Sequence, residues 1–96
     1  MEKIKKIIKC VVKRRGQEQE FDERKVYASC YAACLSTRLH PQDAEKICEK
    51  VSKQIKSWLK NKKIVTSNQI FKKVILITKK YNKDVSFMYK THRDIG

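Results

Sequence analysis

The sequence predicts a mostly helical α+β domain, in which a four-helix bundle is capped by a small three-stranded sheet. Hydrophobic residues make up 41% of the 96 residues and charged residues 35%, with one proline and two glycines, a balance typical of compact helical proteins. Isoleucine and valine are concentrated in residues 4–13, as in a strand. Apolar side chains recur every three or four positions over residues 44–59, the pattern of an amphipathic helix. This length favours a single domain over residues 1–96.

The first third of the chain is predicted to form a hairpin and then a helix. A first strand is expected over residues 7–13, Gly16 marks the turn, and residues 17–21 return as a second strand. Asp22 is a good N-cap, so a helix is expected from there to about Ser36 or Thr37. The small and apolar positions of this helix share one face that allows close packing: Val26, Ser29, Cys30, Ala33 and Cys34.

The middle of the chain is predicted to be one long helix. Residues 39–41 form a loop in which Pro41 occupies the first turn, where a helix tolerates proline. The amphipathic helix that follows has about five turns, with lysines and glutamates on the outer face. This outer face is expected to be solvated.

Two shorter helices are predicted to follow a third extended segment. Residues 64–65 are long enough only for a short strand or an extended link. Thr66 and Gln69 then form a capping box for a helix that runs to about Tyr81. Asp84 is expected to cap the last helix.

The net charge, and the absence of membrane-span and catalytic motifs, reduce the number of functional classes to consider. The net charge of +14 favours a phosphate-bearing partner, although a lysine-rich surface alone does not require one. No run of about 18 apolar residues is present, so we expect a cytoplasmic protein without a membrane span. Catalysis is not expected, because the sequence lacks a Gly-x-x-x-x-Gly-Lys loop and any recognisable nucleophile–base or metal constellation.

The four cysteines do not form a sequence motif for metal binding. None belongs to a Cys-x-x-Cys pair, and the two histidines lie far from them in the sequence. We therefore expect buried, reduced thiols and no metal site. If zinc were bound, its ligands would be Cys30, Cys34 and Cys48.

A cluster of cations around Gly16 is typical of a polyphosphate site. Lys13, Arg14 and Arg15 end the first strand, and Lys25 lies one turn into the following helix. The amide groups of a helix start attract anions, and the cations neutralise them. Solvated charges at the end of a strand remain the alternative interpretation of the basic triplet.

Two motifs in this region resemble those of the ATP-cone, the regulatory nucleotide-binding domain of ribonucleotide reductases and of their transcriptional repressor. The first is Val12-Lys13-Arg14-x-Gly16, and the second is Phe21-Asp22-x-x-Lys25-Val26. The resemblance continues through Thr66-Ser67-Asn68-Gln69-Ile70, and through Tyr89 and Arg93 spaced four apart. It covers the chain roughly from residue 11 to residue 95.

The resemblance implies a nucleotide site with a role for each matched residue. Lys13 and Lys25 hold the phosphates, with Arg14 beside them, and Phe21 and Asp22 line the base. The remaining implied contacts are Val12 packed beneath the base, the hydroxyl of Ser67 facing the nucleotide, Phe71 where some members carry a ribose-side histidine, and Gln19 where a glutamate commonly reads the adenine amino group. The sequence also departs from the family at Arg15, which replaces an aspartate or asparagine.

By this resemblance the chain is expected to be a non-catalytic sensor of ATP or dATP, with magnesium as a companion ion, linked to control of deoxyribonucleotide synthesis. Its partner would be a ribonucleotide reductase catalytic domain or a second copy of itself. A free-standing module, a reductase domain and the cone of a repressor all fit. The alternative functions are a small basic nucleic-acid-binding protein and a helical interaction module.

Overall fold

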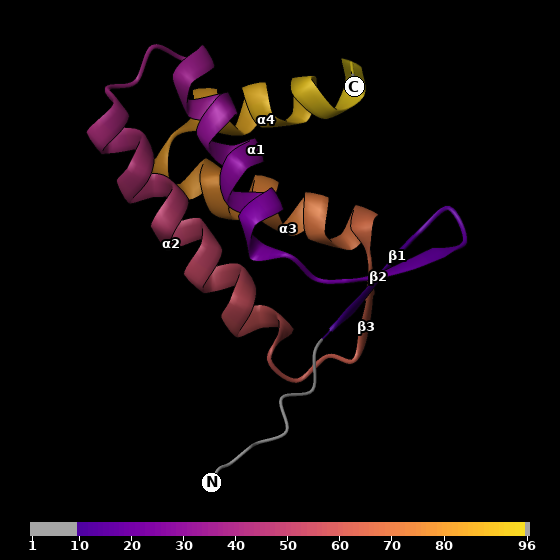
Figure 1. The fold of residues 1–96 in the computed structure, drawn as a ribbon. Coiled ribbons are helices and arrows are strands. Elements are labelled where there is room, and N and C mark those ends of the chain that lie inside the picture. The colour runs from indigo at the N-terminus through magenta and orange to yellow at the C-terminus, as the bar shows by residue number, and fades with distance from the viewer. Residues whose placement is uncertain (1–9, 96) are drawn as a thin grey trace, which may run out of the picture.

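Four helices and a mixed sheet form the domain, as the sequence predicted (Figure 1). The computed structural model describes residues 10–95. The first strand was expected from residue 7, and its residues 7–9 lie outside this range. The elements, in chain order, are β1 (Val11–Arg14), β2 (Gln17–Glu20), α1 (Glu23–Ser36), α2 (Pro41–Leu59), β3 (Ile64–Thr66), α3 (Ser67–Tyr81) and α4 (Lys83–Ile95).

The sheet has the strand order β2-β1-β3 and joins distant parts of the chain. β1 pairs antiparallel with β2, placing Val12 opposite Gln19, and parallel with β3, placing Val12 opposite Val65. The hairpin turn consists of Arg15 and Gly16, with φ angles of 51° and 84°. Two successive positive φ angles are the geometry of a tight turn that follows the twist of the strands, and glycine adopts it without a steric penalty.

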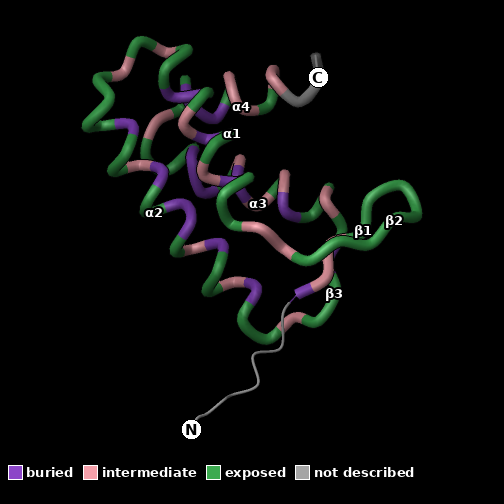
Figure 2. Tube along the Cα trace, in the orientation of Figure 1, coloured by how far each residue is buried: buried purple, intermediate pink, exposed green. Residues whose placement is uncertain are grey.

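The core lies between the facing sides of the helices (Figure 2). α1 contacts α2 and α4, and α3 contacts the same two helices. Val65 of β3 is buried, so the sheet also contributes a side chain to this core. The largest fully buried side chains come from α1, α2, α3 and α4: Ile55, Val51, Val74, Val85, Thr78, Cys30, Cys34 and Cys48.

Helix caps confirm one prediction and correct another. The Thr66 hydroxyl accepts a hydrogen bond from the Gln69 amide at 3.0 Å, and the Gln69 side chain accepts from the Thr66 amide at 2.9 Å. The predicted cap at Asp84 is wrong, because the Asn82 side chain accepts from the amides of Asp84 and Val85 at 2.9 and 3.1 Å. Asp84 therefore lies in the first turn of α4.

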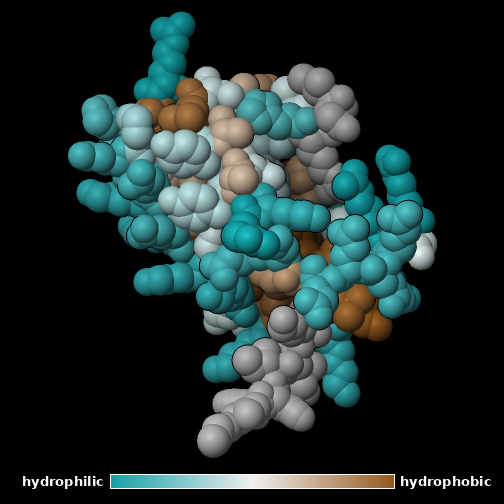
Figure 3. Space-filling view, in the orientation of Figure 1, coloured by the Kyte–Doolittle hydropathy of each residue, from teal (hydrophilic) through white to brown (hydrophobic). Residues whose placement is uncertain are grey.

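Most of the visible surface is hydrophilic (Figure 3). Polar and charged side chains cover the outer side of α2 and the hairpin in this view, as expected for the solvated face of the long helix. Among the described residues, no helix is both long enough and apolar enough to span a membrane.

Candidate functional site

A cavity of about 870 Å³ opens where the hairpin meets α1, α3 and α4. Four separate segments of the chain build it, so it exists only in the folded domain. Its lining residues are Val12, Arg14, Arg15, Gln17, Gln19, Glu20, Phe21, Asp22, Lys25, Val26, Ser29, Ala32, Ser67, Ile70, Phe71, Tyr89 and His92.

The predicted binding residues converge on this cavity, with the exception of Lys13. The residues that line it are Val12, Arg14, Gln19, Phe21, Asp22, Lys25, Ser67 and Phe71. Side chains alternate between the two faces of a strand, so Val12 and Arg14 share one face of β1 and Lys13 occupies the other. The Lys13 ammonium instead lies 3.8 Å from the Glu18 carboxylate on β2. The phosphate-binding role of Lys13 stays a prediction.

Positive side chains gather at the hairpin side of the cavity. Arg14, Arg15 and Lys25 line it together with the carboxylate residues Glu20 and Asp22. Arg15 is held there by the turn at a φ of 51°, a conformation that costs a non-glycine residue energy.

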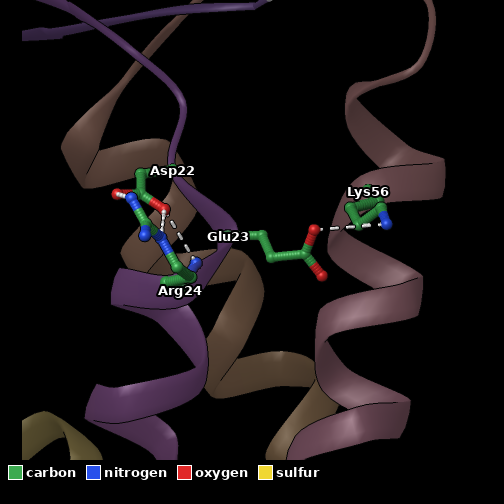
Figure 4. Close-up of polar contacts among 4 residues, drawn as sticks. All are labelled: Asp22, Glu23, Arg24 and Lys56. Atoms are coloured by element: carbon green, nitrogen blue, oxygen red, sulfur yellow. Dashed lines mark hydrogen bonds and ion pairs between the residues drawn. The ribbon is translucent and has the colours of Figure 1, made fainter.

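The N-terminus of α1 is organised by Asp22 (Figure 4). The Asp22 carboxylate accepts hydrogen bonds from the Arg24 amide at 3.0 Å and from the Arg24 guanidinium at 3.2 Å through each of its two oxygens. These side-chain and backbone hydrogen bonds from Arg24 lower the pKa of Asp22. The Arg24 amide is thus paired with the Asp22 side chain, and the Lys25 amide donates to the Asp22 carbonyl at 3.1 Å, so these two helix-start amides already have partners.

An ion pair fixes the same end of α1 to α2. The Glu23 carboxylate points away from the cavity residue Asp22 and lies 3.2 Å from the Lys56 ammonium (Figure 4). Both side chains are about half exposed, so the pair contributes little to stability. The pair joins the first turn of α1 to α2, while Lys25 of the same helix lines the cavity.

Apolar and aromatic side chains form another part of the lining. The rings of Phe71 on α3 and Tyr89 on α4 stack with their centroids 5.5 Å apart. Val12 and Phe21 are half-buried and pack against the core. A cavity that combines apolar walls with a few convergent charged groups can hold a ligand that has a flat apolar part and an anionic part.

Other lining residues were not assigned by the sequence. Ser29 was expected on the packing face of α1, but it is exposed and lines the cavity with Ala32. Both follow Lys25 at helical spacing, four and seven residues later, and this periodicity was the signal that could have found them. His92 reaches the cavity from α4, and its Nε2 lies 3.2 Å from the Ser36 hydroxyl.

Three of the four buried cysteines meet at a second location. The sulfur atoms of Cys30, Cys34 and Cys48 lie within 4.8 Å of one another, and none of the three side chains is exposed. Hydrogen bonding to Cys34, together with burial, raises the pKa of Cys30 to about 12. Hydrogen bonds with Cys30 and Cys34 raise the pKa of Cys48, and those from its two neighbours lower the pKa of Cys34. These three are the ligands expected from the sequence if zinc were bound, but the spacing did not show that their sulfur atoms meet.

Comparison with protein-family models gives a match over most of the chain. The family model described as "ATP cone domain" aligns with residues 9–90, which is most of the chain. The chain matches no curated protein and no solved structure. The matched range includes the hairpin, α1, α2, β3, α3 and the first part of α4, and therefore every lining residue of the cavity except His92.

Proposed function

The chain belongs to the ATP-cone family, and from this premise we propose that it is a non-catalytic regulatory domain that binds ATP or dATP in the cavity between the hairpin, α1, α3 and α4. Membership of this family implies a nucleotide-binding regulatory domain. The observation that carries the proposal is the composition of the cavity. Cations from the hairpin and α1 face the same space as apolar side chains from β1, α3 and α4.

The phosphates are assigned to the cationic side of the cavity. Arg14, Arg15 and Lys25 line it and can form charge-assisted contacts with phosphate oxygens. Lys13 is assigned to the phosphates by the family motif; because its side chain lies on the other face of β1, it would have to give up the exposed ion pair with Glu18 and reach past the end of the strand. A magnesium ion would arrive with the triphosphate and reduce the charge that these residues have to neutralise.

The adenine base is assigned to the apolar side. Val12, Phe21 and Phe71 offer surfaces for the flat base, and Ser67 at the start of α3 offers a hydroxyl. Gln19, on the strand next to Val12, carries both an amide donor and a carbonyl acceptor, so it can pair with the edge of the base. Because an amide that both donates and accepts can pair with either base, the expected preference for adenine over guanine rests on membership of the family.

Regulation requires that the nucleotide bind two arrangements of the domain or its assembly with different affinities. The elements that line the cavity are linked through the sheet, because β1 pairs with β3 and β3 leads directly into α3. They can move as one unit only while this pairing is kept. We propose that this linkage carries nucleotide occupancy to a partner surface. The proposed partner is a ribonucleotide reductase catalytic domain or a second copy of the chain, and the proposed process is control of deoxyribonucleotide synthesis.

Titration calorimetry at physiological salt tests the proposal. ATP and dATP are expected to bind with micromolar or tighter affinity and to raise the melting temperature as their concentration rises. GTP and inorganic triphosphate are expected to bind at least ten-fold more weakly. The matched control is Lys53→Ala, which removes an exposed α2 lysine outside the cavity. Equal affinity for ATP, GTP and triphosphate would show that no base is recognised and would contradict the proposal.

The net charge of +14 makes nucleic acid the competing ligand. The structure has features of a nucleic-acid-binding surface: Phe87 is 66% exposed, and the ammonium groups of Lys62 and Lys73 lie over the Trp58 ring, at 5.1 and 5.6 Å from its centroid. Single-stranded nucleic acid binds aromatic rings and cations together, so the two functions have to be separated by experiment. Binding to duplex DNA should weaken steeply with salt, with a log–log slope of about −0.9 per phosphate contacted. ATP binding that survives the salt concentration abolishing DNA binding separates the two functions.

A further inference from the structure

The cysteine cluster lies at the packed interface of α1 and α2, apart from the nucleotide cavity. Cys30 and Cys34 are one turn apart on α1, and Cys48 faces them from α2. None of the three lines the cavity, whose α1 residues lie at other positions of the helix. Cys10, the remaining buried cysteine, does not belong to the cluster.

We propose that Cys30, Cys34 and Cys48 form a closed three-sulfur site for a soft monovalent metal ion, copper(I). The geometry is close to what such an ion needs. With metal–sulfur bonds of about 2.3 Å, three sulfurs in a plane around one ion are about 4.0 Å apart. The sulfurs lie within 4.8 Å of one another, so each has to move inward by about 0.5 Å or less to reach these bond lengths. Changes of this size need only small adjustments of side-chain rotamers.

The number and chemistry of the ligands select the metal. Thiolates prefer copper(I), zinc or iron–sulfur clusters. Structural zinc sites are almost always four-coordinate, and iron–sulfur clusters usually take four cysteines. Among the side chains that the structure describes, no histidine, aspartate, glutamate or fourth cysteine joins the three. The full burial of the cluster also leaves no opening through which water could complete a tetrahedral zinc site.

Ser52, one helical turn from Cys48, is a polar residue that suits a charged site better than an apolar core. Ser52 is 5% exposed, and its hydroxyl has no hydrogen-bond partner within the described structure. It follows Cys48 by one helical turn on the buried face of α2. A buried hydroxyl without a partner is costly, and a metal-bound thiolate nearby would give it an acceptor.

Binding exchanges three sulfur–hydrogen bonds for three copper–sulfur bonds. Copper remains in the +1 state, and up to three protons are released to the solvent. The resulting complex carries negative charge, which the strongly positive domain around it favours. Because the sulfurs are fully buried, the ion reaches them only when α1 and α2 separate transiently, so uptake and release are expected to be slow.

The test uses the full chain, reduced and kept free of oxygen, with copper(I) supplied as its coloured bicinchoninate complex. One equivalent of copper is expected to transfer to the protein, with an X-ray absorption spectrum showing three sulfur neighbours. Cys34→Ala and Cys48→Ala are each expected to lower the copper affinity at least ten-fold. Cys10→Ala is the matched control, because it removes a buried cysteine outside the cluster and should leave the affinity unchanged.

Two results would overturn the proposal. The first is an equal loss of copper binding in Cys10→Ala and Cys48→Ala, which would mean that the cluster is not the site. The second is tight zinc binding with a four-coordinate spectrum that copper(I) does not displace, which would mean that a fourth ligand exists. The spectrum of the unmodified protein counts the sulfurs without relying on any variant. ATP affinity in a folded Cys48→Ala variant should be unchanged, so this test is separate from that of the nucleotide site.

Discussion

Replacing Lys25 by methionine is the most direct test of the nucleotide cavity. Methionine keeps most of the length and the apolar stem of the side chain while removing the charge. Lys25 is exposed, lies in the first turns of α1 and lines the cavity beside Arg14 and Arg15. A charge-assisted contact with phosphate contributes about 1.5–3 kcal/mol, so the Kd for ATP is expected to rise about 10- to 150-fold.

Stability should respond differently from affinity. An exposed side chain outside the core changes the free energy of unfolding by about 0.5 kcal/mol or less, which corresponds to about 2–4 °C in melting temperature for a domain of this size. Calorimetry with ATP and a thermal melt of the ligand-free protein measure the two quantities. Lys53→Met changes another exposed lysine, on α2 and outside the cavity, and is the control for loss of charge alone. A loss of affinity under three-fold in Lys25→Met, or the same loss in Lys53→Met, would refute the assignment of Lys25 to the phosphates.

Three further variants test the strands and the cap. Lys13→Met is expected to weaken ATP binding less than Lys25→Met in calorimetry, because Lys13 must first leave Glu18; unchanged affinity would remove it from the site. Thr66→Ala removes the capping box of α3 and should cost about 1 kcal/mol, lowering the melting temperature by about 4–8 °C; a melt within 1 °C of the original would mean that the cap contributes nothing. Arg15→Asn places a residue that tolerates positive φ in the hairpin turn, so we expect a higher melting temperature together with weaker ATP binding, since a cavity cation is lost. Tighter ATP binding by that variant would show that Arg15 does not contact the phosphates.

Most of the fold could be predicted from local sequence patterns. The periodicity of α2, the capping box of α3 and the glycine turn each depend on residues close in sequence, so they could be predicted without knowing the tertiary structure. The cap of α4 was harder, because Asn82 and Asp84 are both good caps and stand two residues apart. The choice depends on where the backbone leaves the extended conformation, and Asn82 is the residue that remains extended.

Contacts between helices and strands could not be predicted from the sequence. Cys30 and Cys34 were expected on one helix face, but their meeting with Cys48 depends on the relative axial position of α1 and α2. That position is set by packing across the whole interface, and no local pattern records it. The position of Lys13 is a different case. The alternation of side chains along β1 already places Lys13 on the other face from Val12 and Arg14. The family resemblance assigned Lys13 to the phosphates by motif alone.

The parallel pairing of β1 with β3 also has a consequence for the order in which the chain folds. It joins residues 11–13 to residues 64–66, and both α1 and α2 lie between them in the sequence. A hairpin of two four-residue strands is barely stable alone, and closing so long a loop is slow until the intervening helices have docked. We infer that the sheet closes last and opens first, so that a bound nucleotide would hold together the least stable part of the domain. Hydrogen exchange of the amides in β1 and β2 should then slow more on ATP binding than exchange within α2.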